Sequence, residues 1–124
     1  MFAKTNAYSG FAVPDLDEAR AFYEGTLGVR VSQENDLLTL HLAGNRDTLV
    51  YPKPDHVPAN YTILNFPVDD VDAAVDVLRE RGVQFEQYEG FDQDEKGISR
   101  GNGGPTIAWF TDPAGNVMSV LEEM

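Results

Sequence analysis

The sequence contains no cysteine, few basic side chains and no long apolar run. The absence of cysteine excludes disulfide bonds and thiolate chemistry. Nine Lys and Arg stand against 21 Asp and Glu, and the resulting net charge of −12 argues against nucleic acid and anionic membranes as partners. No apolar run reaches the roughly 18 residues of a membrane span, and the N-terminal residues lack a signal-peptide layout. We therefore expect a soluble, cytoplasmic protein.

The chain is long enough to fold as one domain with its own core. It has 124 residues, 42% of them hydrophobic, including seven Phe, five Tyr and one Trp. A chain of this length buries roughly two-thirds of the surface that its unfolded form exposes. We expect a single folded domain over residues 1–124 rather than a disordered chain.

An internal repeat divides this domain into two similar halves. The segment 11–19 reads FAVPDLDEA, and the segment 66–74, which lies 55 positions later, reads FPVDDVDAA. The same Phe, Val, Asp, Asp and Ala recur at matching positions, which indicates two copies of one structural unit. We predict a first module at 1–52, a proline-containing linker at 53–60 and a second module at 61–124.

Each half has the pattern of a strand, a helix and three further strands. Asp15 and Asp70 precede apolar residues at helical spacing and suit helix N-caps, and Gly28 and Gly82 stand where the two helices should end. Alternating and β-branched runs predict the strands. These are residues 6–13, 29–33, 37–42 and 48–51 in the first half, and 62–66, 83–88, 106–111 and 116–121 in the second.

A segment of about 16 residues, 89–104, lies outside these elements and is rich in glycine and charge. Two interpretations stay open for it, a binding loop or lid, and a disordered surface excursion. Within it, Arg100 either closes over a bound anion or is solvated. Farther on, the sequence Asp-Pro-Ala-Gly at 112–115 predicts a tight turn between two strands.

The quoted repeat, together with residues 22–23 (Phe-Tyr), 27–28 (Leu-Gly) and 109–116 (WFTDPAGN), resembles the vicinal oxygen chelate superfamily. This superfamily includes glyoxalase I, extradiol dioxygenases and the bleomycin-resistance proteins. The resemblance covers nearly the whole chain. It implies an α+β fold, in which two βαβββ modules pair into a curved sheet enclosing a cup. A fold does not by itself fix a function.

The resemblance also implies where the metal ligands of the metal-dependent members would fall. The matching positions hold Tyr8, Ile63, Ser119 and, at the end of the first half, Val50 or Tyr51. None of these is the His, Gln or carboxylate that the family uses, and divalent metals prefer such donors. We therefore expect no metal and no cofactor at this site. Glu122 is offset from the matching position and has no positive support as a substitute.

With the ligands absent, the cup is predicted to be a binding pocket with few polar groups. The candidate ligand-binding residues are Tyr8, Tyr51, Ile63, Asn65, Trp109 and Ser119. Tyr51 and Trp109 offer flat faces for an aromatic ligand or a cation. The alternative is that these side chains fill the interior as ordinary core.

Three functions stay open. The first is a metal-free protein of the bleomycin-resistance type that sequesters a drug or metabolite. We expect its ligand to be small and apolar or aromatic, cations included, and the protein to be a homodimer. The second is a glyoxalase-like lyase, isomerase or dioxygenase with a non-standard site, for example with Tyr8 as general acid and His41 as base. The third is a dimeric module whose cup is filled by its own side chains. His56, in the linker, is expected to have no role.

Overall fold

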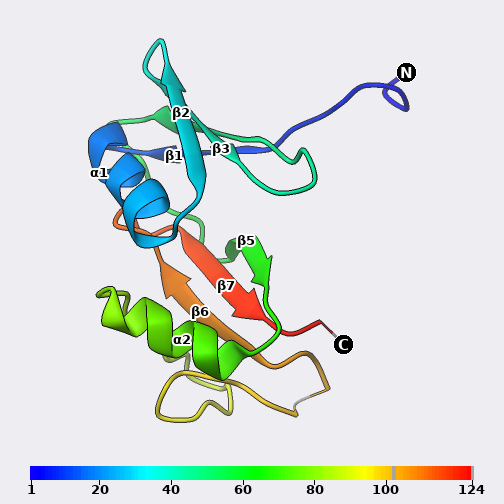
Figure 1. Cartoon of the computed structure of the whole chain (residues 1–124), viewed down its shortest axis with the longest axis vertical. Helices are drawn as coiled ribbons and strands as arrows, with labels where there is room; N and C mark the ends of the chain where they lie inside the picture. Colours follow the sequence, from blue (N-terminus) through cyan, green and yellow to red (C-terminus); the bar gives the residue numbers. More distant parts are fainter. Residues whose placement is uncertain (102, 124) are drawn as a thin grey trace. The chain divides into compact units, whose positions relative to one another are not determined.

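The fold is a mixed α+β arrangement with two small sheets and few helices, as the sequence predicted (Figure 1). The computed structural model describes residues 1–101 and 103–123. The chain separates into two compact units, Met1–Val57 and Pro58–Met124. That the two units enclose a common cup stays a prediction. Among the described residues, no helix has both the length and the apolar character needed to cross a bilayer.

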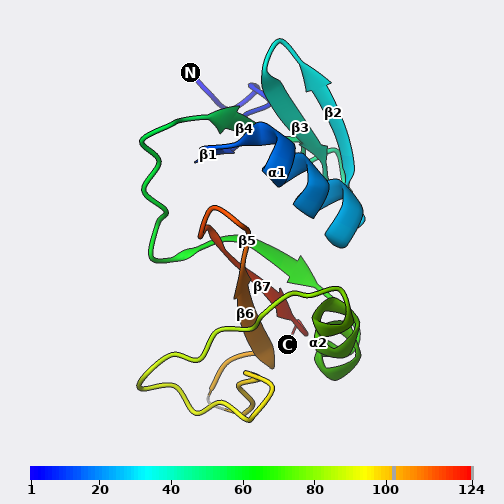
Figure 2. The same ribbon diagram turned by 90° about the vertical axis from the view of Figure 1, so that its left-hand side faces the viewer.

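The first unit is a four-stranded sheet with one helical segment against it. The sheet order is β1-β4-β3-β2, with β1 parallel to β4 and the other neighbours antiparallel. The helical segment contacts β3 and β4, and Figure 2 shows it lying along one face of the sheet. The elements are β1 (Gly10–Val13), α1 (Leu16–Arg20), η1 (Ala21–Thr26), β2 (Arg30–Glu34), β3 (Leu37–His41) and β4 (Thr48–Pro52).

The helical segment begins at the predicted cap but does not stay α-helical. The Asp15 carboxylate accepts a hydrogen bond from the backbone N–H of Glu18 at 3.1 Å, as an N-cap does. After α1 the chain widens into the π-helical turn η1, where the N–H of Leu27 donates to the carbonyl of Phe22. Tyr23, in this turn, is fully buried and its ring lies 5.8 Å from that of Phe11. The wider turn thus carries the largest buried side chain of the unit.

The first strand is shorter than predicted. The sequence pattern predicted a strand over residues 6–13, whereas β1 begins at Gly10. Its neighbour β4 begins at Thr48. At this end of the strand pair, the backbone N–H of Leu49 donates a hydrogen bond to the carbonyl of Ser9. Residues before Ser9 have no partner strand to pair with, so the prediction was wrong there.

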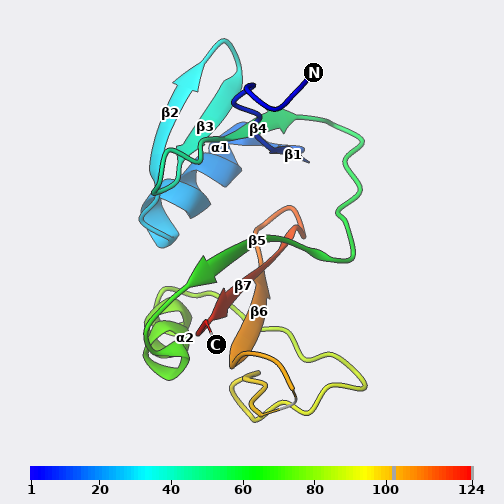
Figure 3. The ribbon, with the colours of Figure 1, turned by 90° about the vertical axis from the view of Figure 1, so that its right-hand side faces the viewer.

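The second unit is a three-stranded sheet with one longer helix. The sheet order is β5-β7-β6, with β5 parallel to β7 and β6 antiparallel to it (Figure 3). Helix α2 contacts β6 and β7. The alternate strand residues Ala108, Phe110, Met118 and Val120 are buried, as are Val71 and Val75 of the helix. The elements are β5 (Thr62–Pro67), α2 (Val71–Glu80), β6 (Ile107–Thr111) and β7 (Val117–Leu121).

Helix α2 repeats the capping of α1, which confirms this part of the repeat. The Asp70 carboxylate accepts from the N–H of Ala73 at 3.2 Å. Glu122 adds a second acceptor, at 2.9 Å from the N–H of Val71. Glu122 therefore serves the helix N-terminus, where a negative charge is favourable. Gly82 has a φ of 88°, a left-handed conformation that glycine adopts without strain at the end of a helix.

The strand predicted over residues 83–88 is not formed. Only Phe85 bridges to β6, opposite Phe110, and the N–H of Glu86 donates to the carbonyl of Trp109. Beyond that point Ser99 pairs with Ile107, the position that residue 88 would face in a regular strand. The outer edge of β6 is thus shared by two short segments, and this excludes a continuous strand.

A tight turn at residues 112–116 joins β6 to β7, as predicted. One carboxylate oxygen of the buried Asp112 accepts from the backbone N–H groups of Ala114 and Asn116, at 3.0 and 2.8 Å. The other accepts from the side-chain amide of Asn116 at 3.0 Å. Gly115 has a φ of 89°, which a side chain would strain. One carboxylate therefore organises the whole turn.

We predict that Asp112→Ala lowers the free energy of unfolding by about 2–3 kcal/mol, because the buried Asn116 loses two hydrogen bonds to the carboxylate. Urea unfolding followed by circular dichroism measures this change. Asp112→Asn keeps one acceptor oxygen, so its free energy of unfolding should lie between those of Asp112→Ala and the wild type. A loss below about 0.5 kcal/mol in Asp112→Ala, the range of ordinary surface substitutions, would contradict this role of the carboxylate.

Candidate functional site

Three of the predicted binding residues form one row across the second sheet. Ser119 of β7 is the register partner of Asn65 on β5 and of Trp109 on β6. Directly opposite residues of neighbouring strands point to the same face of a sheet. The hydroxyl of Ser119 donates to the side-chain oxygen of Asn65 at 2.6 Å. The structure therefore brings Asn65, Trp109 and Ser119 together on one face, and their role in binding stays a prediction.

This row lies on the sheet face opposite α2. Because strand side chains alternate, the buried set with Phe110 and Met118 occupies the helix face, and the row occupies the other. Ser119 is buried, Trp109 is half-buried and Asn65 is exposed. The same face carries the half-buried apolar side chains of Ile107, Val117 and Leu121. It also carries Thr62 and Thr111, the register partners of Val117. The face therefore combines apolar side chains with a few polar ones, among them one hydrogen-bonded pair.

Two aromatic residues that the sequence did not single out extend this face. The rings of Tyr88 and Phe91 lie 5.6 and 5.2 Å from that of Trp109, and 6.2 Å from each other. All three contacts are edge-to-face, a favoured aromatic geometry. Phe91 remains 56% exposed. We call Tyr88, Phe91 and Trp109 the aromatic cluster.

The segment that carries Phe91 is held by specific hydrogen bonds. The side-chain amide of Gln93 bonds to three backbone groups, the N–H of Tyr88 and the carbonyls of Glu86 and Gly97. One carboxylate oxygen of Asp94 accepts from the N–H groups of residues 96 and 98, each at 2.9 Å. Ile98 is buried. Of the two interpretations of residues 89–104, this bonding argues against a disordered excursion over the described part.

Arg100 makes ion pairs rather than standing free to close over an anion. Both of its terminal nitrogens lie 2.9 Å from the carboxylate oxygens of Asp72 on α2, and one lies 2.9 Å from Asp94. The guanidinium holds the pKa of the Asp72 carboxyl below its usual range. Lys96 adds an ion pair to Asp76 at 2.8 Å. These contacts connect the segment to α2.

Ile63 lies at an irregularity of β5. The register shifts there, so that Thr62 faces Val117 and Leu64 faces Met118, while Ile63 has no register partner on β7. A bulge of this kind interrupts the alternation of faces. The alternation that would place Ile63 beside Asn65 therefore does not hold across it, and its role in binding stays a prediction.

Tyr8 and Tyr51 belong to the first unit. Tyr8 lies before β1 and is 71% exposed. Tyr51 lies on β4 and is 39% exposed, while its neighbour Val50 is fully buried. Tyr51 thus points to the face opposite α1. These two residues and the row belong to different units, and their part in a common site stays a prediction.

The residues at the family's ligand positions do not suit a divalent metal. Ile63 has no donor atom, and the Ser119 hydroxyl is bonded to Asn65. Glu122 is bonded to the start of α2. Within residues 1–101 and 103–123, no three His, Cys, Asp or Glu side chains converge as a metal site would require. The donor set therefore does not fit the metal that the superfamily's enzymes use.

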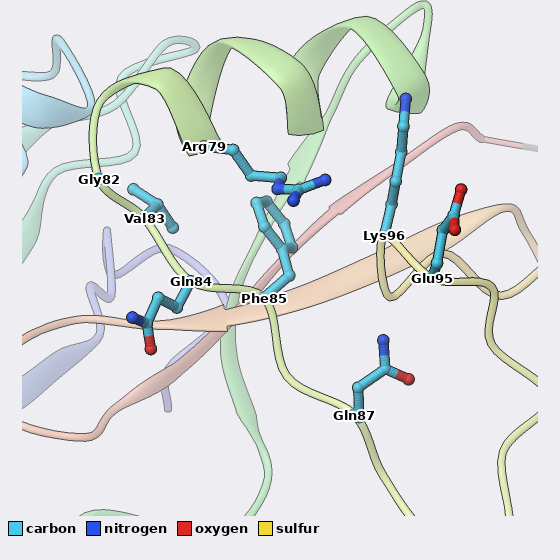
Figure 4. A pocket seen from close by; sticks show the side chains of 8 residues that line it. All are labelled: Arg79, Gly82, Val83, Gln84, Phe85, Gln87, Glu95 and Lys96. Atoms are coloured by element: carbon cyan, nitrogen blue, oxygen red, sulfur yellow. The ribbon is translucent and has the colours of Figure 1, made fainter.

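A separate, open cavity lies in the second unit beside the end of α2 (Figure 4). Its volume is about 480 Å³, and the side chains of Arg79, Phe85 and Lys96 are among those that line it. None of the predicted binding residues lines it. The aromatic cluster is thus distinct from this cavity.

The chain belongs to the Glyoxalase/Bleomycin resistance protein/Dioxygenase superfamily, whose pattern matches residues 6–120. This confirms the resemblance that the sequence motifs indicated. None of the curated proteins matches the chain significantly in sequence.

Solved structures of similar fold agree with this assignment. A superfamily member from Sphaerobacter thermophilus is 24% identical over 96% of this chain and 98% of its own, with a TM-score of 0.73. TnmS3, an antibiotic binding protein from Streptomyces sp. CB03234, is 24% identical over 98% of both chains, with a TM-score of 0.69. The fosfomycin resistance protein FosX from Mesorhizobium loti is 12% identical over 98% and 93%, with a TM-score of 0.66. At these identities the likeness establishes the fold.

We predict that Tyr88 ionises at higher pH than an ordinary tyrosine. Burial, and secondarily the charge of Glu86, raises the pKa of its phenol above 10.0. Because folding favours the neutral phenol, the stability that this group contributes is lost as the pH rises above the unfolded value. The absorbance of phenolate is titrated against pH in the wild type and in Tyr88→Phe. The difference between the two curves gives the titration midpoint of Tyr88.

Glu86→Gln should lower this midpoint, whereas Glu89→Gln, a matched charge change in an exposed neighbour, should move it less. A midpoint at or below 10 for Tyr88 would contradict the packing of the aromatic cluster.

Proposed function

We propose that this protein is a metal-free small-molecule binder of the glyoxalase/bleomycin-resistance type, which sequesters a drug or metabolite. The observation that carries the proposal is the aromatic cluster beside the hydrogen-bonded Asn65–Ser119 pair. An apolar face with a few placed polar groups is the usual make-up of a ligand site. The same proposal includes a cytoplasmic location and a homodimeric state for the protein.

The chemistry of this face favours a flat aromatic ligand. Exposed aromatic rings bind a planar ligand by stacking and edge contacts. The exposed amide of Asn65 offers a polar group for orientation. The face also favours a cation, because Glu86 is close enough to influence Tyr88 and the whole chain carries a charge of −12. A positive ligand is attracted both to the field and to the ring faces.

The named relatives support a role in drug handling. TnmS3 is an antibiotic binding protein and FosX is a fosfomycin resistance protein. A shared fold alone does not transfer either property. Together with the aromatic cluster, these names favour sequestration of a small molecule as the function to test first.

An enzyme of the same superfamily is the alternative from the sequence. It would need a metal held by substituted ligands, or a metal-free pair such as Tyr8 and His41. The side chains at the family's ligand positions do not suit a divalent metal. Both side chains of the latter pair lie in the first unit, where His41 is hydrogen-bonded to Ser32 and Asp47. Within residues 1–101 and 103–123, no hydrogen bond joins Tyr8 to His41, so this pair has less support than the binding function.

We predict saturable quenching of Trp109 fluorescence by 9-aminoacridine, a flat aromatic cation. Trp109 is the single tryptophan of the chain, so its emission reports without interference from others. Tyr88→Ala and Phe91→Ala should each weaken binding about two- to tenfold, the range of one aromatic contact. The anionic dye 8-anilinonaphthalene-1-sulfonate should bind more weakly than the cation, because of the negative field.

Phe2→Ala serves as the matched control, because Phe2 is also exposed but lies at the N-terminus. Quenching that does not saturate, or that Phe2→Ala weakens as much as Phe91→Ala, would contradict the proposed site. Native mass spectrometry of the same sample reports oligomer mass, bound metal and retained small molecules. One divalent metal ion per chain together with catalytic turnover would contradict the binding function and support the enzyme alternative.

A further inference from the structure

A chain of hydrogen bonds links a serine, a histidine and an aspartate in the first unit. The hydroxyl oxygen of Ser32 lies 2.7 Å from Nε2 of His41. On the other side of the ring, Nδ1 lies 3.2 Å from a carboxylate oxygen of Asp47. The functions discussed above use neither Ser32 nor Asp47, and the enzyme alternative pairs His41 with Tyr8 instead.

The register of the sheet produces this arrangement. His41 of β3 faces Arg30 on β2, and Ser32 faces Thr39, so Ser32 and His41 lie diagonally on one face. On the other side of β3, the pairing of Thr39 with Leu49 and of Leu40 with Thr48 leads directly to Asp47 opposite His41. The imidazole is thus held between the two partners by backbone pairing.

The face is the accessible one. Leu38 and Leu40 of β3 are fully buried, and α1 contacts β3. His41, which alternates with them, points to the opposite face together with Ser32, and Ser32 and Asp47 are exposed. A reagent in solution can therefore reach the hydroxyl.

The hydrogen bonds suit activation of the serine. A neutral imidazole that donates from Nδ1 to the carboxylate has a free lone pair on Nε2, which accepts the serine proton. Asp47 then stabilises the imidazolium that forms. Arg30 places a positive charge on the same face, two residues before Ser32 and opposite His41. That charge favours the negative oxygen of an acyl-transfer intermediate.

We propose that Ser32 is a nucleophile for activated carboxylic esters, with His41 as its base and Asp47 as the group that orients the base. The Ser32 oxygen forms a bond to the carbonyl carbon while its proton moves to Nε2 of His41. The bond from that carbon to the leaving oxygen then breaks, and the leaving group takes the proton. Water hydrolyses the acyl-serine by the same proton route, giving the acid and restoring the hydroxyl. This activity goes beyond the proposed binding function and uses none of the aromatic cluster.

The test uses 4-nitrophenyl acetate and the full-length protein. We expect release of 4-nitrophenolate, and one acetyl group on the peptide that contains Ser32 by mass spectrometry. Ser32→Ala and His41→Gln should each lower the rate about a hundredfold or more, the lower end of the range for acid–base groups. Asp47→Asn, which removes the charge but keeps the size, should lower it less than His41→Gln.

The controls are matched within the chain. Ser9→Ala removes another exposed serine, and His56→Gln removes the other of the two histidines; both should keep the wild-type rate. Circular dichroism of each variant checks that it folds. Acetylation elsewhere than Ser32 would overturn the proposal. So would full activity in Ser32→Ala with loss in His41→Gln, since the imidazole would then be the nucleophile.

Discussion

The register of β6 against β7 depends on the turn that Asp112 organises. The carboxylate fixes the backbone of residues 114 and 116 and the amide of Asn116, and the first strand pair beyond the turn is Thr111 with Val117. From that pair the ladder leads to Trp109 opposite Ser119 and, across β7, to Asn65. A slip of one residue would move Trp109 to the helix face. The arrangement of the candidate site therefore depends on a turn that is not part of the site.

The second requirement of the site is the divided outer edge of β6. Because Phe85 and Ser99 pair with different ends of β6, the chain between them leaves the sheet. Gln93 bonds to the backbone of this departing segment, and Arg100 ties it to Asp72 of α2. The departure is what brings Tyr88 and Phe91 to the ring of Trp109. One segment of the chain thus covers the outer edge of β6 and also carries two of the rings of the aromatic cluster.

Local signals in the sequence predicted much of this fold. Asp15 and Asp70 cap their helices, glycines end them, and the Asp-Pro-Ala-Gly turn forms where expected. Most strands follow their apolar alternation. The motifs indicated the superfamily. Of the row, Asn65 was predicted from strand alternation, Ser119 from the position that the resemblance gives it, and Trp109 from its flat aromatic face.

What the sequence did not predict depends on contacts between distant residues. The strand expected at 83–88 has the right composition, but Ser99 occupies its place beside Ile107. The shift at Ile63 is a property of the pairing with β7, not of the residue. Tyr88 and Phe91 were missed because aromatic contacts across a loop leave no periodic pattern. Ser32 and His41 lie nine positions apart, and only the register of β2 and β3 shows that they meet.

The central claim is that a flat aromatic cation binds at the aromatic cluster of the second sheet. The most direct measurement is the ¹H–¹⁵N spectrum of the labelled protein during titration with 9-aminoacridine, because its indole signal comes from Trp109 alone. The account predicts saturable shifts of that signal and of the amides of Tyr88, Phe91 and Ser119. An unmoved indole signal, with shifts confined to the cavity of Arg79 and Lys96, would contradict it.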